Sequence, residues 1–402
     1  MSLYRAKISD LGKIVTGKTP STQNKDNFGG NIPFITPVDM TYNRNVFFTE
    51  RYVSSKGAES VKGCVLPPKT VCVSCIGSDM GKSVITTQTS ITNQQINSII
   101  VSEKNNYMYV YYLMRMLEST IKSLGKNGTA VPILSKSKFS EIEIQVHDFE
   151  SQCQIAKILS TYDDLIENNQ KQIKLLEEAA QRLYKEWFVD LRFPGYEKTA
   201  VVDGVPEGWN RCSLNDVIAF NPKVSLDRNR EKQFVPMSAL STNSMVLNSS
   251  EYTFTLSNSG SKFQNGDTLL ARITPCLENG KTAFVFGIDS DEGAVGSTEY
   301  IVMRSKELNP YMVYILARTD DFRQYAVNSM SGSDGRQRVQ VDKLMAYPFL
   351  KPPACLIQMF TKFADPIFTQ IYTKNKQIIE LQKARDRLLP KLMSGEMEIN
   401  NG

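Results

Sequence analysis

The sequence contains few of the residues from which catalytic and metal sites are usually built. Its 402 residues include one histidine, His147, and seven cysteines without regular spacing. Cys72 and Cys75 form the only close pair, and they lie in the alternating run TVCVSCIG, which is typical of a strand. A redox pair needs a helix start and a zinc site needs a second pair, so we predict neither. An odd number of cysteines indicates reduced thiols in a cytoplasmic protein.

Long apolar runs are also missing. No stretch approaches the length of a membrane span, and we expect neither such a span nor a secretory signal. The sequence lacks the D/N-P-P-Y/F motif and the glycine-rich loop after a strand that a DNA methyltransferase would contain. A lone histidine is more often structural than catalytic. With 22% charged and 41% hydrophobic residues, the composition suits a binding protein of two or three domains.

One motif suggests nucleotide chemistry. Residues 12–19, GKIVTGKT, match the P-loop pattern G-x-x-x-x-G-K-[ST]. A P-loop joins a buried strand to a helix whose N-terminal N–H groups bind phosphates. The preceding segment, MSLYRAKISDL, is too polar for a core strand, and Pro20 disfavours a helical conformation at Thr19. We therefore predict a turn after a short strand. A P-loop enzyme remains an alternative, which a nucleotide-binding assay would identify.

An internal repeat organises the chain. KQIKLLEEAAQRL (171–183) and KQIIELQKARDRL (376–388) share seven residues at an offset of 205. Such an offset excludes a solenoid and implies a duplicated half. Fainter matches pair ISDLGKI with CSLNDVI, SDMGKSV with LENGKTA, and GKNGTAV with MSGSDGRQRV. The second of these matches predicts a strand hairpin in each half, with Asn279-Gly280 as a favoured turn.

Both copies of the repeat carry a long helical pattern. The heptad positions are Ile155, Tyr162, Leu176 and Leu183 in the first copy and Phe360, Ile367, Leu381 and Leu388 in the second. In the first copy, these positions are flanked by Ile158, Leu159, Leu165, Ile166, Ile173 and Ala180. This period predicts a coiled-coil seam, although each helix could instead pack on its own domain. Asn169 and Lys374 should form a polar layer in the seams. Pro366 predicts a kink or restart, and the regular stretch around Ala180 should lie away from both domains.

The predicted fold class is therefore α+β, with two mixed α/β domains in internal repeat, each followed by a long helix. A segment rich in turn-forming residues links the two halves. The predicted boundaries are 1–150 for the first domain, 151–192 for the first helix, 193–210 for the linker, 211–353 for the second domain, and 354–402 for the second helix and tail.

The charge distribution favours nucleic acid only weakly. The net charge is +5, of which residues 1–150 contribute +5 and residues 199–350 contribute −2. Arginine can pair with guanine, and glutamine or asparagine with adenine. A single such residue is more often a solvated surface group, but here they cluster in matching loops. The candidate DNA-binding residues are Lys18, Thr19, Ser78, Lys82, Gln94, Gln95, Lys126, Asn127 and Thr129 in the first domain, and Arg272, Thr274, Glu278, Lys281, Glu299, Asp334, Arg336, Gln337 and Arg338 in the second.

The sequence resembles the specificity subunits of type I restriction–modification systems. The order of domain and helix carries this resemblance, together with VPEGW…LNDV (205–217), GKTPS near the start and the NGK hairpin. The first domain departs from the pattern, since it begins with YRAKISDL and lacks a counterpart of Trp209. The resemblance implies two target-recognition domains related by a pseudo-twofold and separated by an antiparallel coiled coil. Each domain would recognise one part of a split double-stranded DNA sequence.

The resemblance also implies partners. Two modification subunits, which carry the adenine methyltransferase, would dock on this chain, and restriction subunits with motor and nuclease functions would join them. The chain itself would be non-catalytic and hold no cofactor. S-adenosylmethionine, ATP and Mg would bind to the partner subunits. A coiled-coil scaffold that binds no DNA is the remaining alternative, and it should show no sequence-selective DNA binding.

Overall fold

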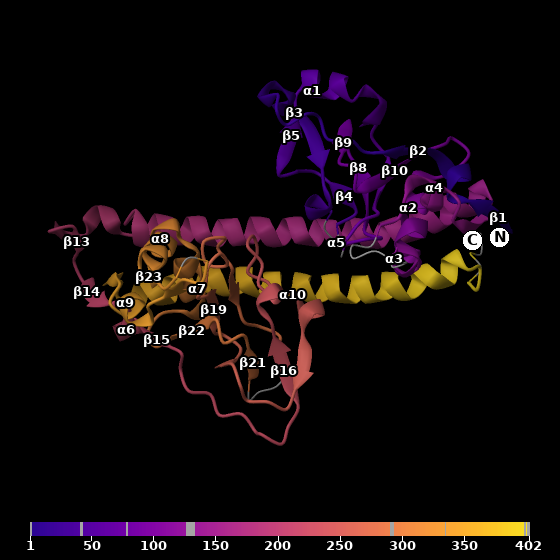
Figure 1. The fold of residues 1–402 in the computed structure, drawn as a ribbon. Coiled ribbons are helices and arrows are strands. Elements are labelled where there is room, and N and C mark those ends of the chain that lie inside the picture. Colours follow the sequence, from indigo (N-terminus) through magenta and orange to yellow (C-terminus); the bar gives the residue numbers. More distant parts are fainter. Residues whose placement is uncertain are drawn as a thin grey trace. The chain divides into compact units, whose positions relative to one another are not determined.

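The chain folds into two compact units that share its two long helices. The computed structural model describes residues 2–40, 43–77, 79–125, 133–289, 293–333, 335–397 and 399. The first unit comprises residues 1–168 and 378–402, and the second comprises residues 169–377. Helices α5 (Phe149–Tyr184) and α10 (Ala354–Met393) are each continuous and contribute to both units (Figure 1). No helix in the described ranges combines the length and apolarity that a membrane crossing requires.

The first unit contains two sheets, a strand pair and four short helices. The larger sheet has the order β2 (Gly12–Thr16), β10 (Ile96–Val101), β7 (Val71–Ser74), β8 (Ser83–Thr86), β4 (Asn45–Val46). The smaller sheet has the order β5 (Arg51–Val53), β3 (Phe28–Ile35), β9 (Ser90–Thr92), β6 (Val65–Leu66). The strand pair is β1 (Leu3–Lys7) with β11 (Glu143–His147). The helices are α1 (Ser55–Ser60), α2 (Tyr107–Met116), α3 (Glu118–Gly125) and α4 (Lys136–Ser140).

The second unit repeats this arrangement. Its first sheet has the order β15 (Ile218–Phe220), β22 (Tyr300–Ser305), β19 (Thr268–Ala271), β20 (Thr282–Phe284). The other sheet has the order β17 (Thr253–Thr255), β16 (Lys232–Val235), β21 (Ala294–Gly296), β18 (Ser261–Phe263). The two-stranded pairs are β14 (Asn210–Ser213) with β25 (Pro348–Lys351), β12 (Val201–Val202) with β13 (Val205–Pro206), and β23 (Met330–Ser331) with β24 (Arg338–Val339). The helices are α6 (Leu214–Val217), α7 (Pro310–Arg318), α8 (Asp320–Asn328) and α9 (Val341–Met345).

The duplication is visible in strand order, strand direction and helix caps. β2, β10, β7 and β8 correspond to β15, β22, β19 and β20. The other sheet of each unit contains one parallel pair, β3 with β9 in the first unit and β16 with β21 in the second. Both hairpins predicted from SDMGKSV and LENGKTA are present, as β7–β8 and β19–β20. Asn106 and Asn309 cap α2 and α7 by accepting N–H groups of the first turn. The predicted α+β fold with an internal repeat is confirmed.

Within each unit, α5 and α10 pack against each other. In the second unit, Asn169 donates to Gln377 (3.3 Å) while Trp187 lies against Phe360, so the two helices run antiparallel. In the first unit, Asp163 forms a salt bridge with Arg385. Both helices also join the core of the first unit, through residues such as Ile155 and Leu392. The two packing hypotheses are therefore both correct, because the helices pair with each other and with their domains.

The buried stripe of α5 differs in detail from the predicted seam. It runs through Ile166, Ile173 and Ala180 but also through Asp163 and Glu177, whereas the heptad residues Tyr162, Leu176 and Leu183 are only half-buried. A pattern of apolar residues alone misses buried carboxylates that have partners. Asn169 is buried in this stripe, as expected for a polar layer, and it donates to Gln377 of α10.

Two further expectations about the helices need correction. Pro366 does not restart α10, which is continuous from Ala354 to Met393, so only a kink at this residue stays a prediction. Ala180 does not lie away from the domains, since it is 1% exposed and belongs to the second unit. One turn before it, Glu177 accepts a hydrogen bond from Tyr314 of α7 (2.5 Å). This part of α5 is therefore an integral element of the second unit.

Candidate nucleic-acid interface

The glycines of the P-loop motif allow close contact between backbones. Gly12 begins β2, and a Cβ atom there would lie 2.2 Å from the Ile100 carbonyl oxygen on β10. A Cβ atom at Gly17 would lie 2.2 Å from the Asn93 carbonyl oxygen. Residues 12–16 are themselves a strand, and residues 17–24 form no helix. The P-loop hypothesis is therefore wrong, and the motif shows where a loop follows β2.

The other residues that suggested separate chemistry belong to the core. Cys72 and Cys75 are buried in and just after β7, and burial raises the pKa of Cys72 to about 12 and that of Cys75 to about 11. His147 ends β11, and its Nδ1 lies 3.0 Å from the Tyr109 hydroxyl. Burial lowers the pKa of this histidine. These side chains are structural.

The predicted recognition loops of the first unit meet at one edge of the larger sheet. Adjacent strands in β2-β10-β7-β8 are antiparallel, so β2 and β7 end where β10 and β8 begin. At this edge the Cys75 N–H donates to the Gln95 carbonyl (2.8 Å), and the Leu134 N–H donates to the Cys75 carbonyl (2.9 Å). These bonds join the loops that follow β7 and β9 and the segment before α4.

The candidate side chains of the first unit follow this edge. Lys18 is exposed, and the Thr19 hydroxyl donates to the Gln94 side-chain carbonyl (2.9 Å). Gln95 accepts from the Asn93 amide (2.9 Å). Lys82 forms a salt bridge with Asp79. Four predicted residues lie outside the described residues, namely Ser78, Lys126, Asn127 and Thr129.

The equivalent edge of the second unit repeats the same backbone bonds. The Arg272 N–H donates to the Glu299 carbonyl (2.9 Å), and the Val339 N–H donates to the Arg272 carbonyl (2.9 Å). Arg272 thus corresponds to Cys75, Glu299 to Gln95, and Val339 to Leu134. Thr274 donates through its N–H to the Gln337 carbonyl (3.1 Å). The two edges are one backbone scaffold used twice.

The candidate side chains of the second unit separate into exposed and bonded groups. Arg336 and Glu278 are exposed. Arg338 donates through Nε and Nη2 to the Glu299 carboxylate (3.0 and 2.6 Å), and this contact lowers the pKa of Glu299. Lys281 donates to the Met237 carbonyl (3.1 Å), so its ammonium also supports the loop. Asp334 lies outside the described residues.

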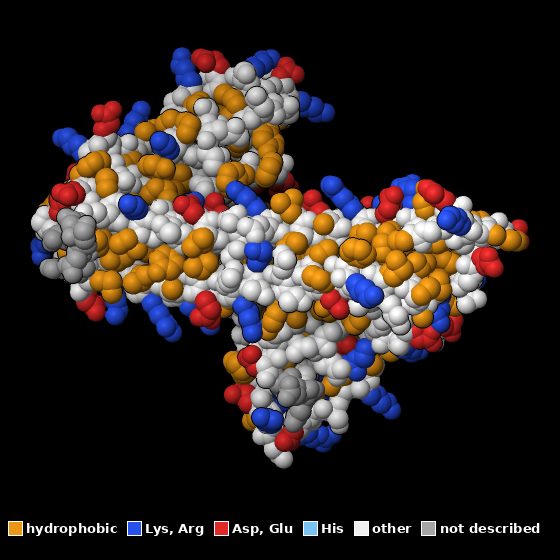
Figure 2. All heavy atoms as spheres, turned by 180° about the vertical axis from the view of Figure 1, so that it is seen from behind, with side chains coloured by type: hydrophobic (Ala, Val, Ile, Leu, Met, Phe, Trp, Pro, Cys, Tyr) orange, Lys and Arg blue, Asp and Glu red, His pale blue; other side chains and the backbone are white. Residues whose placement is uncertain are grey.

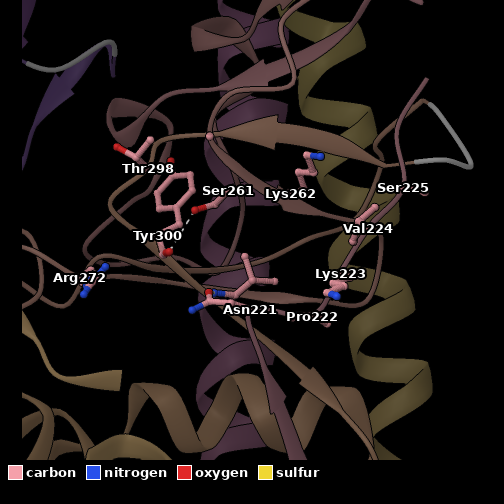
Figure 3. Close-up of a pocket in the computed structure, with 12 residues that line it drawn as sticks. Asn221, Pro222, Lys223, Val224, Ser225, Ser261, Lys262, Arg272, Thr298 and Tyr300 are labelled. Carbon is pink, nitrogen blue, oxygen red and sulfur yellow. Dashed lines mark hydrogen bonds between the residues drawn. The ribbon is translucent and has the colours of Figure 1, made fainter. Parts of the chain in front are cut away.

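A cleft at this second edge contains residues that the sequence did not single out. Its volume is about 620 Å³, and it lies between the loop after β15 and strand β18 (Figure 3). Asn221, Lys223 and Lys262 line it together with Arg272. Lys223 follows β15 as Lys18 follows β2, so the repeat contained a signal for it.

On the face drawn in Figure 2, charged side chains of one sign form no extended patch, because basic, acidic and hydrophobic side chains are interspersed. This agrees with the small net charge of +5. Binding to a polyanion would therefore depend on local groups of side chains, such as those at the two edges.

Comparison with known proteins identifies the family. Residues 5–178 match a family described as the type I restriction modification DNA specificity domain. The chain is also 28% identical to the type I restriction enzyme MjaIX specificity subunit of Methanocaldococcus jannaschii, over 98% of this chain and 93% of that protein. Residues 5–178 therefore belong to the type I restriction–modification DNA specificity domain family, and the whole chain is similar to specificity subunits of these systems. A shorter match, at 40% identity, covers 34% of this chain and 30% of the HindI specificity subunit of Haemophilus influenzae.

A solved structure shares the fold. The crystal structure of a type I restriction–modification S subunit from M. genitalium superimposes with a TM-score of 0.58 over 99% of this chain and 97% of that one, at 13% identity. As a specificity subunit, the chain is a DNA-recognition component of a restriction–modification complex and not its catalytic component.

Proposed function

We propose that each unit recognises one part of a bipartite DNA target through the edge described above. The supporting observation is that the two edges share their backbone hydrogen bonds but differ in side chains. Gln95 in the first unit corresponds to Glu299 in the second. Ile133, which bridges to Ile76, corresponds to Arg338, which bridges to Ile273. A repeated scaffold with different side chains suits two different short sequences.

The chemistry of these side chains predicts that the two parts of the target differ. Glutamine offers both a donor and an acceptor and can pair with adenine, whereas a carboxylate only accepts and can pair with the amino group of cytosine. Exposed Arg336 suits the two acceptors of guanine. The target is therefore an asymmetric, bipartite sequence.

Membership of the family supports a proposal about partners. Two modification subunits would bind this chain and methylate adenine with S-adenosylmethionine, and restriction subunits would use ATP and Mg. This chain would supply recognition only, and the complex would act in the cytoplasm, where the host DNA is. Co-purification of the chain with both kinds of subunit would test this assembly.

Replacing Arg336 by alanine tests the recognition proposal. Loss of a base contact costs about 1–3 kcal/mol, so discrimination should relax at one position of one part of the target. Arg336 is exposed, so we expect no loss of stability. Sites can be selected from a random duplex library, or mapped as methylated positions when the modification subunit is present.

Gln94→Ala supplies the reciprocal variant, because Gln94 is exposed at the edge of the first unit. It should alter only the other part of the target. Loss of discrimination at both parts in either variant would contradict the division of recognition between the units.

A further inference from the structure

The cleft of the second unit concentrates positive charge in a domain whose overall charge is negative. Three cationic side chains, Lys223, Lys262 and Arg272, line it, together with the polar residues Asn221, Ser261 and Thr298. None of the described residues that line it is acidic. Residues 199–350 carry a net charge of −2, so this cleft is a local exception. Figure 3 shows the two lysines and Arg272 on opposite sides of the hollow.

The two lysines have no partners within the described part of the chain, neither hydrogen-bonded nor ionic. Lys232, by contrast, is buried nearby in sequence and donates to the carbonyls of Asp227 and Leu256 (2.8 and 3.2 Å). Structural lysines in this unit are thus tied to backbone oxygens, whereas Lys223 and Lys262 are not. Two uncompensated ammonium groups beside one cleft favour an anionic ligand.

The lining excludes a pocket for a base. Among the described residues of the lining, the only aromatic side chain is Tyr300, which is 2% exposed and donates its hydroxyl hydrogen to the Pro236 carbonyl (2.6 Å). Its ring therefore offers no free face on which a base could stack. Ammonium, hydroxyl and amide groups without an aromatic platform suit phosphate oxygens.

The cleft is joined to the candidate recognition loop through Arg272. This residue lines the cleft, and its Nε donates to the Val339 carbonyl (3.3 Å). Val339 ends β24, which follows directly on Arg336 and Gln337. A phosphate held in the cleft would therefore fix the position of the DNA strand relative to those side chains.

We propose that this cleft binds a backbone phosphate of duplex DNA and anchors the strand whose bases the second unit recognises. The proposal rests on the proposed function. Phosphate contacts position a protein on DNA without selecting its sequence. Lys223 and Lys262 should therefore contribute to affinity for every duplex, whereas Arg336 contributes to discrimination.

The size of the effect follows from counterion release. Each phosphate contact changes the logarithmic salt dependence of binding by about 0.9, so it strengthens binding about eightfold at 0.1 M salt relative to 1 M. Lys223→Gln with Lys262→Gln removes both charges that hold this phosphate, so it should weaken binding about eightfold at 0.1 M salt and reduce the slope by about 0.9. Glutamine keeps most of each aliphatic stem and removes only the charge.

The test measures binding of the full chain to fluorescent duplexes across a range of salt concentrations. The duplexes are a sequence selected by the wild-type chain and a scrambled one. The expected result is an equal loss on both duplexes, a shallower salt slope and an unchanged selected sequence. Lys223→Arg with Lys262→Arg should retain the affinity. The control pair Lys198→Gln and Lys362→Gln removes two exposed charges of the same unit, on the linker and on α10, and should change the slope little.

Three results would overturn the proposal. An unchanged slope in the glutamine variant would show that no phosphate binds in the cleft, and an altered selected sequence would show that the cleft contacts bases. An equal loss in the control pair would indicate only a general effect of charge. If Lys262→Gln prevents folding, the single variant Lys223→Gln, at an exposed position, carries the test with half the expected slope change. A wild-type chain that binds the selected and scrambled duplexes equally would instead contradict the proposed function.

Discussion

The two units hold the long helices with different chemistry at equivalent positions. Asp163 of α5 and Phe368 of α10 are 205 residues apart, the offset of the repeat. In the first unit, Asp163 accepts a hydrogen bond from Tyr112 (2.5 Å) and forms a buried salt bridge with Arg385. In the second unit, Phe368 stacks on Tyr311 with ring centroids 3.9 Å apart. The same topology therefore holds a charged seam in the first unit, around Asp163 and Arg385, and an aromatic seam in the second, around Phe368 and Tyr311.

The difference shows that a duplicated fold can stabilise equivalent parts of its helices by two kinds of interaction. Aromatic contacts add to stability through buried area and stacking. A buried ion pair contributes little net stability, because desolvation offsets the attraction, but losing one partner is costly. Arg44 extends the charged seam by pairing with Asp164 (2.7 Å) and Glu167 (3.2 Å). The stability of the first unit thus depends on the pairing of each buried charge, whereas the stability of the second depends on how closely its aromatic rings pack.

The largest effect should come from lengthening α5 inside the aromatic seam. Four residues inserted after Ala180 would displace Tyr184 and Trp187 by about 6 Å along the helix axis and separate them from Phe360. The second unit should lose its fold, and recognition of its part of the target should be abolished. Limited proteolysis and site selection would measure both. A variant with a protease-resistant second unit would show that the seam adapts.

The matched control places the insertions at the boundary between the units. Four residues after Asn168 in α5 and four after Gln377 in α10 leave the Asn169–Gln377 bond and both seams intact. The added length of about 6 Å corresponds to about two base pairs. We expect an unspecified spacer longer by one to two base pairs, with both parts of the target unchanged. Methylation mapping that still found the original spacing would show that the helices do not set it.

The next effect is on the charged seam. Arg385→Met leaves Asp163 buried without its cation and should cost about 3–5 kcal/mol of stability. The double variant Asp163→Leu with Arg385→Met should recover most of this loss, because an apolar pair of similar size can replace a buried ion pair. Denaturation followed by circular dichroism would measure both. Additive losses in the double variant would contradict the interpretation of the seam as a coupled pair.

Much of this architecture could be predicted from sequence, and what was missed has a physical cause. The repeat at offset 205 predicted the duplicated α+β fold, because equivalent apolar patterns build equivalent sheets. The seam was misplaced because its buried positions include Asp163 and Glu177, whose burial depends on Tyr112, Arg385 and Tyr314, far away in sequence. No local pattern identifies such partners.

The candidate interface could likewise be predicted only in part. Loops after strands placed the candidate residues at two sheet edges, because strand ends meet there. Sequence could not show that Lys281 bonds to Met237 or that Arg338 is held by Glu299, because these contacts join different loops. The cleft was also missed, since Lys223 and Lys262 are 39 residues apart and come together only through the fold.

The smallest expected effect concerns Glu177, the one carboxylate of the aromatic region that packs against Tyr314. Burial raises the pKa of Glu177, although the Tyr314 hydrogen bond opposes this shift. A carboxyl with a raised pKa in the folded state stabilises the fold fully below its unfolded pKa, and this contribution is lost as pH rises through the folded pKa. The second unit should therefore become less stable over that range.

Glu177→Gln should remove this pH dependence, because the amide is neutral and its oxygen can still accept from Tyr314. At a pH near the pKa of a glutamate in the unfolded chain, the variant should be as stable as the wild type. At higher pH, it should be more stable than the wild type. Both tryptophans, Trp187 and Trp209, belong to the second unit, so denaturation followed by tryptophan fluorescence reports on that unit. Glu178→Gln changes the neighbouring, more exposed carboxylate and should leave the pH profile unaltered. If both variants gave the wild-type profile, Glu177 would be ionised in the folded chain at no cost, and the aromatic seam would tolerate charge as readily as the seam of the first unit.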